Sequence, residues 1–175
     1  MLTRPPDTEV PAHFRGYVNH VPPEGSVIDV LAGQLDSFPA LLRRFPESAT
    51  ETGYAPGKWS LKQSIEHVND TERIMSYRLL RIARGDRTPL PGFEQDDYVA
   101  NSNANARPWS DLIAEFELIR RSTLALVRPI DDAAWLRIGT ASGAPGSARM
   151  FAYVIAGHLT HHANLIESRY AALLK

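Results

Sequence analysis

Two histidines near the C-terminus have the type and spacing that a metal centre requires. His158 and His162 lie four residues apart, so on a helix both imidazoles project from one face on successive turns. With about 100° per residue and Phe151 set at zero, both fall within about 20° of the centre of an apolar stripe. By the same projection Arg169 falls at about 0°. All three side chains are therefore expected to face the core, where neutral imidazoles can bind a divalent cation.

A structural role is the competing interpretation of these histidines. A buried imidazole often serves only as a hydrogen-bonded core residue, and spacing alone does not separate this interpretation from a metal site. His161 falls at the edge of the same stripe, where a surface position or a contact with a ligand histidine is expected. Both interpretations of His158 and His162 stay open at this point.

A preceding helical segment supplies a possible third ligand and a buried acid. His67 lies on the flank of that segment's apolar stripe, and a flank position in a bundle can point into a pocket between helices. Glu72 falls at the middle of the stripe, where an unpaired carboxylate would be costly. It is expected either to form a buried ion pair, with Arg169 or Arg78, or to act in a site.

Three imidazoles would form a neutral ligand set with chemical consequences. Three protein ligands with an open position are the catalytic pattern for zinc. Such an ion can lower the pKa of bound water or hold a thiolate near neutral pH. The chain contains no cysteine, so thiol chemistry would need an external thiol. Arg169 is expected to bind a substrate carboxylate, and Glu72 to orient a histidine or move a proton.

Four amphipathic helices are predicted to position these residues. Helix signals include Ser26 as an N-cap, the capping-box pair Ser60 and Gln63, and Ser110 as a further N-cap. The expected helices cover residues 27–44, 61–84, 110–128 and 148–174. No segment has a convincing strand pattern, so the fold class is an all-α four-helix bundle.

The connections between these helices have distinct compositions. Residues 1–25 form a proline-rich arm that is expected to be ordered but not helical throughout. The connection from Gly85 to Pro108 is long enough to be functional or to span the bundle. The linker from Gly139 to Gly146 is glycine-rich and is expected to be flexible. Trp59, Tyr77 and Tyr98 are candidate pocket walls, with ordinary packing as the alternative.

Composition limits the classes of function. The 175 residues are 43% hydrophobic and carry a net charge of −1, which predicts one soluble domain over residues 1–175. A near-zero charge disfavours binding to nucleic acid or to acidic membranes. No apolar run is long enough for a membrane span, and the N-terminus lacks a signal-peptide pattern. A cytoplasmic protein is expected.

Several motifs together resemble those of a known family. They are the segment Gly57-Lys58-Trp59-Ser60 leading into His67, the runs Arg84-Gly85-Asp86 and Pro91-Gly92-Phe93, and Gly157-His158-Leu159-Thr160-His161-His162 continuing to Arg169-Tyr170. The chain resembles the DinB/YfiT-like superfamily of four-helix-bundle metalloproteins. Bacillithiol transferases and mycothiol-dependent maleylpyruvate isomerases are among its members. The resemblance covers nearly the whole chain.

The resemblance carries its own expectations for the site. It implies that His67, His158 and His162 are the three metal ligands, that the ion is zinc or nickel, and that the protein is a homodimer. His13 and His20 match no ligand position and are expected at the surface of the arm.

The preferred function is metal-dependent transfer of a low-molecular-weight thiol to a small electrophile, with Arg169 or Arg78 positioning anionic groups. A metal-dependent hydrolase that uses water is the first alternative. A non-enzymatic stress-response protein, stabilised by its metal, is the second.

Overall fold

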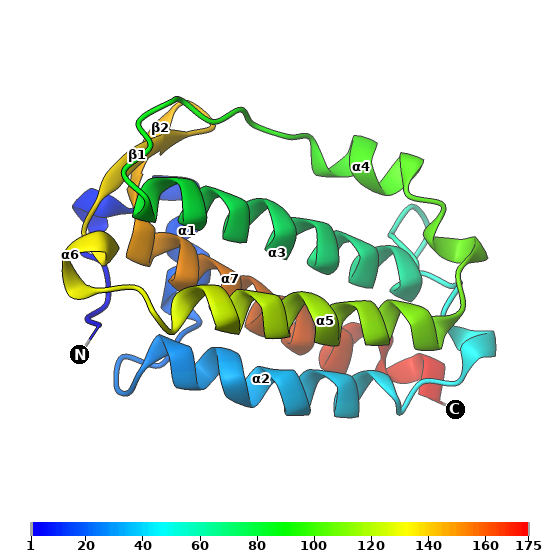
Figure 1. Cartoon of the computed structure of the whole chain (residues 1–175). Helices are drawn as coiled ribbons and strands as arrows, with labels where there is room; N and C mark the ends of the chain where they lie inside the picture. The colour runs from blue at the N-terminus through cyan, green and yellow to red at the C-terminus, as the bar shows by residue number, and fades with distance from the viewer. Residues whose placement is uncertain (1, 175) are drawn as a thin grey trace.

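The computed structural model describes residues 2–174, in which four long helices form a bundle (Figure 1). These are α2 (Val27–Leu42), α3 (Leu61–Ala83), α5 (Trp109–Val127) and α7 (Ala148–Leu165). The arm and the connections hold the short helices α1 (Ala12–Asn19), α4 (Gln95–Asn101) and α6 (Asp132–Trp135). Strands β1 (Ile138–Ala141) and β2 (Ala144–Ser147) pair antiparallel. The predicted four-helix bundle is confirmed.

Local capping explains where the long helices begin. Ser26 caps α2 by accepting a hydrogen bond from the Ile28 amide, and Ser60 with Gln63 forms the predicted capping box of α3. The predicted Ser110 cap is wrong, because α5 begins at Trp109 and Ser110 already lies in its first turn. The Glu47 carboxylate accepts a hydrogen bond of 2.8 Å from the Trp109 amide. A distant acidic side chain therefore provides the cap at this helix end.

The order of the helices in space explains the longest connection. In Figure 1, α2 and α7 run in one direction and α3 and α5 in the other. The bundle is a ring in which α3 packs against α5 and α7, and α2 packs against the same two helices. Because α3 and α5 are parallel neighbours, the chain must return along the bundle between them. Residues 84–108 make this return and contain α4.

The segment expected to be a flexible linker is instead a β-hairpin. Gly139 pairs with Gly146, and the turn places Ser142 and Gly143 at φ values of 52° and 75°, as two-residue hairpin turns require. Leu90 of the return segment donates to Thr140 O at 2.9 Å and accepts from the Ser142 amide at 3.0 Å. The prediction of no strand is therefore wrong. The contact with Leu90 is tertiary and gave no local signal, whereas the hairpin itself is local and its Ser142-Gly143 pair was the available turn signal.

The fourth helix changes its winding near the C-terminus. The regular α-helix ends at Leu165, and a π-helical turn at Ile166–Tyr170 and a 3₁₀ turn at Ala171–Leu174 follow. A π turn bonds each residue to the fifth along and advances fewer degrees per residue than an α-helix. Residues after Leu165 therefore depart from the projected α-helical phase.

The N-terminal arm is ordered and only partly helical, as expected. Helix α1 packs against α7 at Gly157, where a Cβ atom would lie 1.8 Å from the Tyr17 carbonyl oxygen. Glycine at this position therefore allows the arm to approach the histidine-bearing part of α7 closely.

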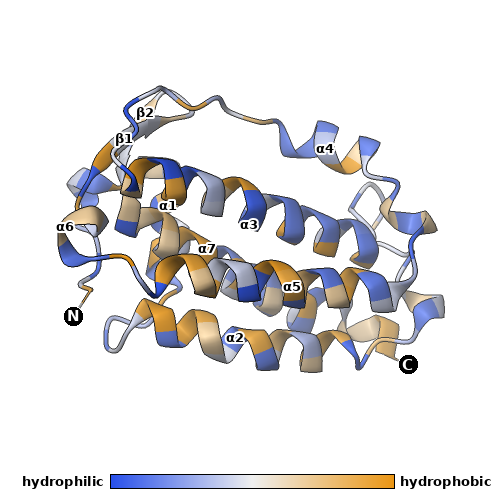
Figure 2. Cartoon of the chain, viewed as in Figure 1, coloured by the Kyte–Doolittle hydropathy of each residue, from blue (hydrophilic) through white to orange (hydrophobic). Residues whose placement is uncertain are grey.

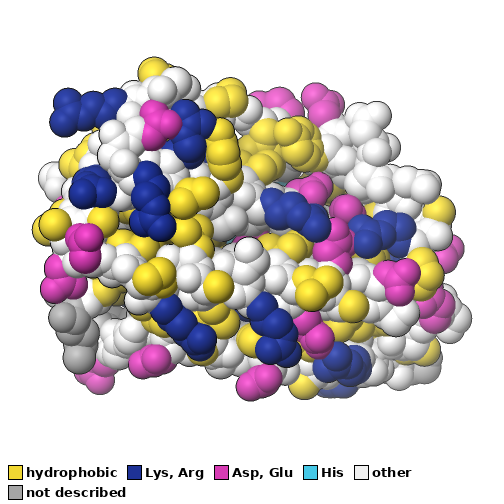
Figure 3. Space-filling view, viewed as in Figure 1, with side chains coloured by type: hydrophobic (Ala, Val, Ile, Leu, Met, Phe, Trp, Pro, Cys, Tyr) yellow, Lys and Arg dark blue, Asp and Glu magenta, His cyan; other side chains and the backbone are white. Residues whose placement is uncertain are grey.

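The buried apolar residues form two clusters along the bundle, one at each end. Figure 2 shows that α4 and the outer side of α3 are mostly hydrophilic, whereas apolar residues are frequent in α2 and α5. Acidic and basic side chains are interspersed over the face in Figure 3. Within residues 2–174, none of the helices combines the length and the apolar character needed to cross a bilayer.

Candidate metal centre

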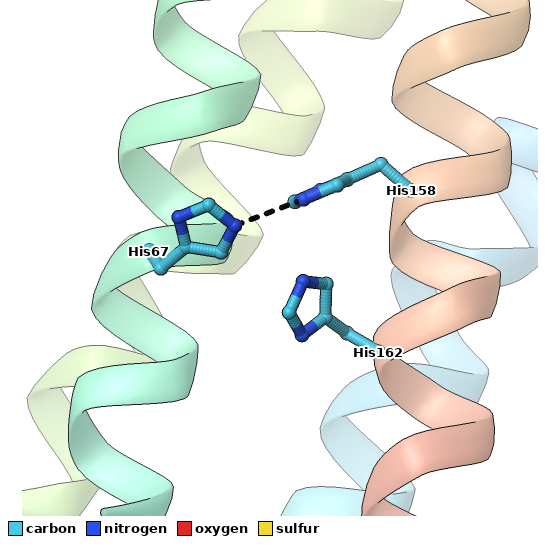
Figure 4. A group of neighbouring side chains, drawn as sticks. All are labelled: His67, His158 and His162. Carbon is cyan, nitrogen blue, oxygen red and sulfur yellow. Dashed lines mark hydrogen bonds between the residues drawn. The ribbon is translucent and has the colours of Figure 1, made fainter. Parts of the chain in front are cut away.

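Three histidines from two neighbouring helices converge inside the bundle (Figure 4). His67 projects from α3, and His158 and His162 project from successive turns of α7. One ring nitrogen from each lies within 4.8 Å of the other two. The Nε2 atoms of His67 and His158 are 3.0 Å apart. The structure thus brings together the three residues that the resemblance assigns as ligands.

Burial keeps these imidazoles neutral. The three residues are between 5% and 7% exposed. Desolvation lowers the pKa of His67 to about 4 and that of His162 to about 3. It also lowers the pKa of His158 well below its ordinary value, with a further contribution from the neighbouring histidines. At neutral pH the rings therefore have lone pairs available for a cation.

The donor set fits a divalent transition metal. Zinc–nitrogen bonds of about 2.1 Å in a tetrahedral site place ligand nitrogens about 3.4 Å apart. The nitrogen–nitrogen distances here are compatible with that value, because one is 3.0 Å and none of the three exceeds 4.8 Å. The buried Nδ1 atom of His162 has no hydrogen-bond partner within residues 2–174. Nitrogen ligands without thiolates or carboxylates suit zinc, nickel or copper better than magnesium or calcium.

Aromatic side chains pack against the histidine rings. The Trp59 ring lies 4.9 Å from that of His67, and the Tyr17 ring meets the edge of His158 at 5.1 Å between centroids. Trp59 precedes the Ser60 cap of α3, and Tyr17 belongs to α1. These contacts fix ring orientation and limit access of water to the histidines.

Two cavities reach the histidine group from different sides. The first, of about 370 Å³, includes α1 residues and is called the arm cavity; its walls include Phe14, Tyr17, His67, His158 and Arg78. The second, of about 360 Å³, reaches the end of α7 and is called the tail cavity; its walls include Lys58, Trp59, His162, Leu165 and Tyr170. Different histidines therefore face different cavities.

Helix α4 supplies a residue that sequence reasoning missed. Asp96 lines both cavities, and its negative charge raises the pKa of His67, partly opposing desolvation. The acidic first turn of α4, with Asp96 and Asp97, was the available signal for a short helix. Its position over the site depends on the path of the return segment, which no local pattern specifies.

Arg169 does not face the core. It is exposed and lines neither the arm cavity nor the tail cavity. The expected inward orientation is wrong because the π turn changes the helical phase. Tyr170 takes the buried position instead, 1% exposed, and its hydroxyl donates to the Trp59 carbonyl at 2.7 Å.

Glu72 is buried, and its partner differs from those expected. Arg120 of α5 donates to both carboxylate oxygens, each at 2.8 Å, in place of Arg169 or Arg78. Arg120 also donates to Leu31 O at 3.0 Å and to Gln34 Oε1 at 2.7 Å. Within residues 2–174, Glu72 makes no hydrogen bond to a histidine. This geometry makes Glu72 part of a structural ion pair with Arg120 and not a hydrogen-bond partner of the three rings.

The other histidines lie at the periphery. His13 and His20 are exposed, as expected, although His13 also lines the arm cavity. His161 is half-buried beside the Tyr17 and His162 rings, at centroid distances of 5.6 and 5.3 Å. This agrees with its predicted place at the edge of the stripe.

Comparisons with known proteins agree with this geometry. The family model described as the DinB superfamily matches residues 31–166. A solved structure, described as "YfiT from Bacillus subtilis is a probable metal-dependent hydrolase with an unusual four-helix bundle topology", is similar with a TM-score of 0.71 at 15% identity. The match covers 97% of this chain and 93% of that one. No curated protein sequence matches. The family match includes all three histidines, and the chain belongs to the DinB superfamily.

Proposed function

We propose that this protein is a divalent-metal-dependent enzyme that transfers a low-molecular-weight thiol to a small electrophile. His67, His158 and His162 would hold the ion, with zinc or nickel as the candidates. The observation that carries the proposal is a buried, neutral three-nitrogen donor set reached by two cavities. When bound, a divalent ion there supplies a Lewis acid that favours the deprotonated form of a thiol or of water.

Two cavities favour a reaction between two substrates. The arm cavity reaches His67 and His158, whereas the tail cavity reaches His162. A thiol and an electrophile can thus approach the same centre from separate sides. The chain contains no cysteine, so the thiol must be a substrate and not a side chain. Asp96 lines both cavities, and in this proposal its carboxylate accepts the proton that a thiol loses.

The walls of the site hold the histidines and restrict water. Trp59 and Tyr17 pack on the rings of His67 and His158. Tyr170 fixes the Trp59 backbone through its hydroxyl and also bonds Ser64 at 3.0 Å. Exclusion of water strengthens electrostatic interactions within the site and limits hydrolysis of a reactive electrophile.

Metal-dependent hydrolysis is the second candidate function. The similar YfiT structure is described as a probable metal-dependent hydrolase, and the same donor set can activate water in place of a thiol. A hydrolase needs one organic substrate, so only one of the two cavities would be required for it.

A thiol-consumption assay separates the candidates. Zinc- or nickel-loaded protein is mixed with glutathione, cysteine or 2-mercaptoethanol and a panel of aryl halides and Michael acceptors, and free thiol is followed. We expect thiol loss that depends on metal, is abolished in His162→Ala and is retained in the exposed control His20→Ala. Ester hydrolysis without thiol, and no thiol loss, would instead support the hydrolase. If neither reaction occurs, both enzymatic proposals fail and a metal-stabilised binding protein is favoured.

A further inference from the structure

Arg78 is a buried cation within the arm cavity. It is 2% exposed and projects from α3. It lines the arm cavity together with His67 and Thr71. Within residues 2–174, none of the ion pairs includes Arg78. A buried charge without a counter-ion is costly, so its retention in a cavity wall points to an anionic ligand.

Some N–H groups of the Arg78 guanidinium make no hydrogen bond within residues 2–174. Its Nη2 atom donates to Pro91 O at 2.7 Å and to Ser142 Oγ at 3.0 Å, and Nη1 makes a weak contact of 3.7 Å with the Met75 sulfur. These contacts use three of the five N–H groups of an arginine. The acceptors are neutral, so they orient the guanidinium plane without cancelling its charge.

The two ends of the arm cavity differ in the charge of the side chains that line them. His67, Thr71, Met75 and Arg78 follow one face of α3. Arg78 lies eleven positions after His67, which is about 16 Å along a helix axis. Asp96 acts on His67 at the histidine end, and Arg78 is the cation at the other end. The buried Thr71 hydroxyl, which has no partner within the described chain, lies between them.

We propose that the arm cavity binds an elongated small molecule with an oxyanion, a carboxylate or a phosphate, at Arg78 and its reactive part near the histidines. Arginine favours such groups because its planar N–H pairs match two oxyanion oxygens. Glu94 also lines this cavity, so with Asp96 its wall carries two acidic side chains. This inference rests on the proposed function and specifies its substrate class.

Binding of simple probes tests the inference without knowledge of the substrate. Hexanoate, hexyl phosphate and the neutral hexanamide are titrated calorimetrically into zinc-loaded and into metal-free protein. We expect either anion to bind at least about tenfold more tightly than the amide, with or without zinc. A higher affinity for hexanoate or for hexyl phosphate identifies which oxyanion the subsite prefers.

Three variants make the result specific to Arg78. We expect Arg78→Met to abolish the preference for anions and Arg78→Lys to retain most of it. Arg121→Met, at an exposed position of α5, should have no effect. If Arg78→Met destabilises the fold, Arg78→Gln takes its place, because it keeps two N–H donors without the charge, and it should likewise lose the preference for anions. Unchanged anion affinity in Arg78→Met, or anion binding that requires zinc but not Arg78, would overturn the inference. If the wild-type protein does not bind zinc, the proposed function is overturned instead.

Discussion

At the scale of single residues, the three histidines combine burial with neutrality. Each imidazole is held away from water, and desolvation lowers the pKa of all three. The cost of protonating them inside the bundle makes them good cation ligands near neutral pH. The same cost couples their protonation to folding.

The stability of the metal-free protein should fall as the pH decreases below 6.5. Unfolded histidine titrates near 6.5, whereas folded His67 titrates at about 4. Between these values the unfolded chain binds more protons, so acid favours unfolding. His67 alone should remove about 2 kcal/mol of unfolding free energy between pH 7 and 5. Urea unfolding at pH 7, 6 and 5 measures this.

Two variants attribute this pH dependence to the buried site. His67→Gln should show a shallower decrease than the wild type, whereas the exposed control His20→Gln should follow the wild type. Parallel curves for all three proteins would show that His67 does not resist protonation in the fold.

Sequence patterns predicted the positions of the histidines better than the positions and partners of the charged residues. The helical period placed His158 and His162 on the buried face because regular α-helix continues through both. The same projection failed for Arg169 because a π turn intervenes. Periodicity also placed Glu72 in the interior, but its partner Arg120 depends on how α3 and α5 pack. Patterns along one helix cannot specify contacts between helices.

At the scale of elements, a polar layer crosses the middle of the bundle. Gln34 of α2, Glu72 of α3 and Arg120 of α5 form one hydrogen-bonded network. Gln34 Nε2 also donates to Ala156 O at 2.8 Å and to Thr160 Oγ1 at 3.0 Å. These α7 atoms flank His158 in sequence, so the layer ties the other three long helices to the helix that presents two histidines.

Removal of one partner from the buried ion pair should destabilise the fold strongly. Arg120→Met leaves the Glu72 carboxylate buried without its partner, and such changes cost about 3–5 kcal/mol. The matched control is Arg43→Met at the exposed Arg43–Glu117 pair of 2.6 Å, where about 1 kcal/mol or less is expected. Denaturant unfolding measures both. Equal effects would show that the interior pair is as dispensable as the surface one.

Substitution of Gly157 should displace the arm. An alanine Cβ there would lie 1.8 Å from the Tyr17 carbonyl oxygen, whereas nothing lies within 4 Å of a Cβ at Gly33. We expect Gly157→Ala to destabilise by about 1–3 kcal/mol and to increase proteolysis of α1. Gly33→Ala, in the exposed part of α2, should stabilise by about 0.5–1 kcal/mol. Stabilisation by both substitutions would contradict the close packing of α1 on α7.

At the scale of the whole molecule, the return segment explains the arrangement of the site. Because α3 and α5 are parallel, residues 84–108 travel the length of the bundle and carry α4 to the two cavities. The length of this connection was predictable from the sequence, whereas its pairing with the β-hairpin was not. The four-helix bundle followed from helical periods and caps. The cavities depend on tertiary packing of the arm and return segment.

Metal stoichiometry tests the central claim most directly. Wild-type protein, offered zinc or nickel and then dialysed, is analysed by elemental mass spectrometry beside His162→Ala and His20→Ala. We predict one ion per chain for the wild type and for His20→Ala, and loss of the ion from His162→Ala, because two imidazoles alone hold a metal weakly. Wild-type protein that retains neither ion, or equal retention by the two variants, would contradict a metal centre at His67, His158 and His162.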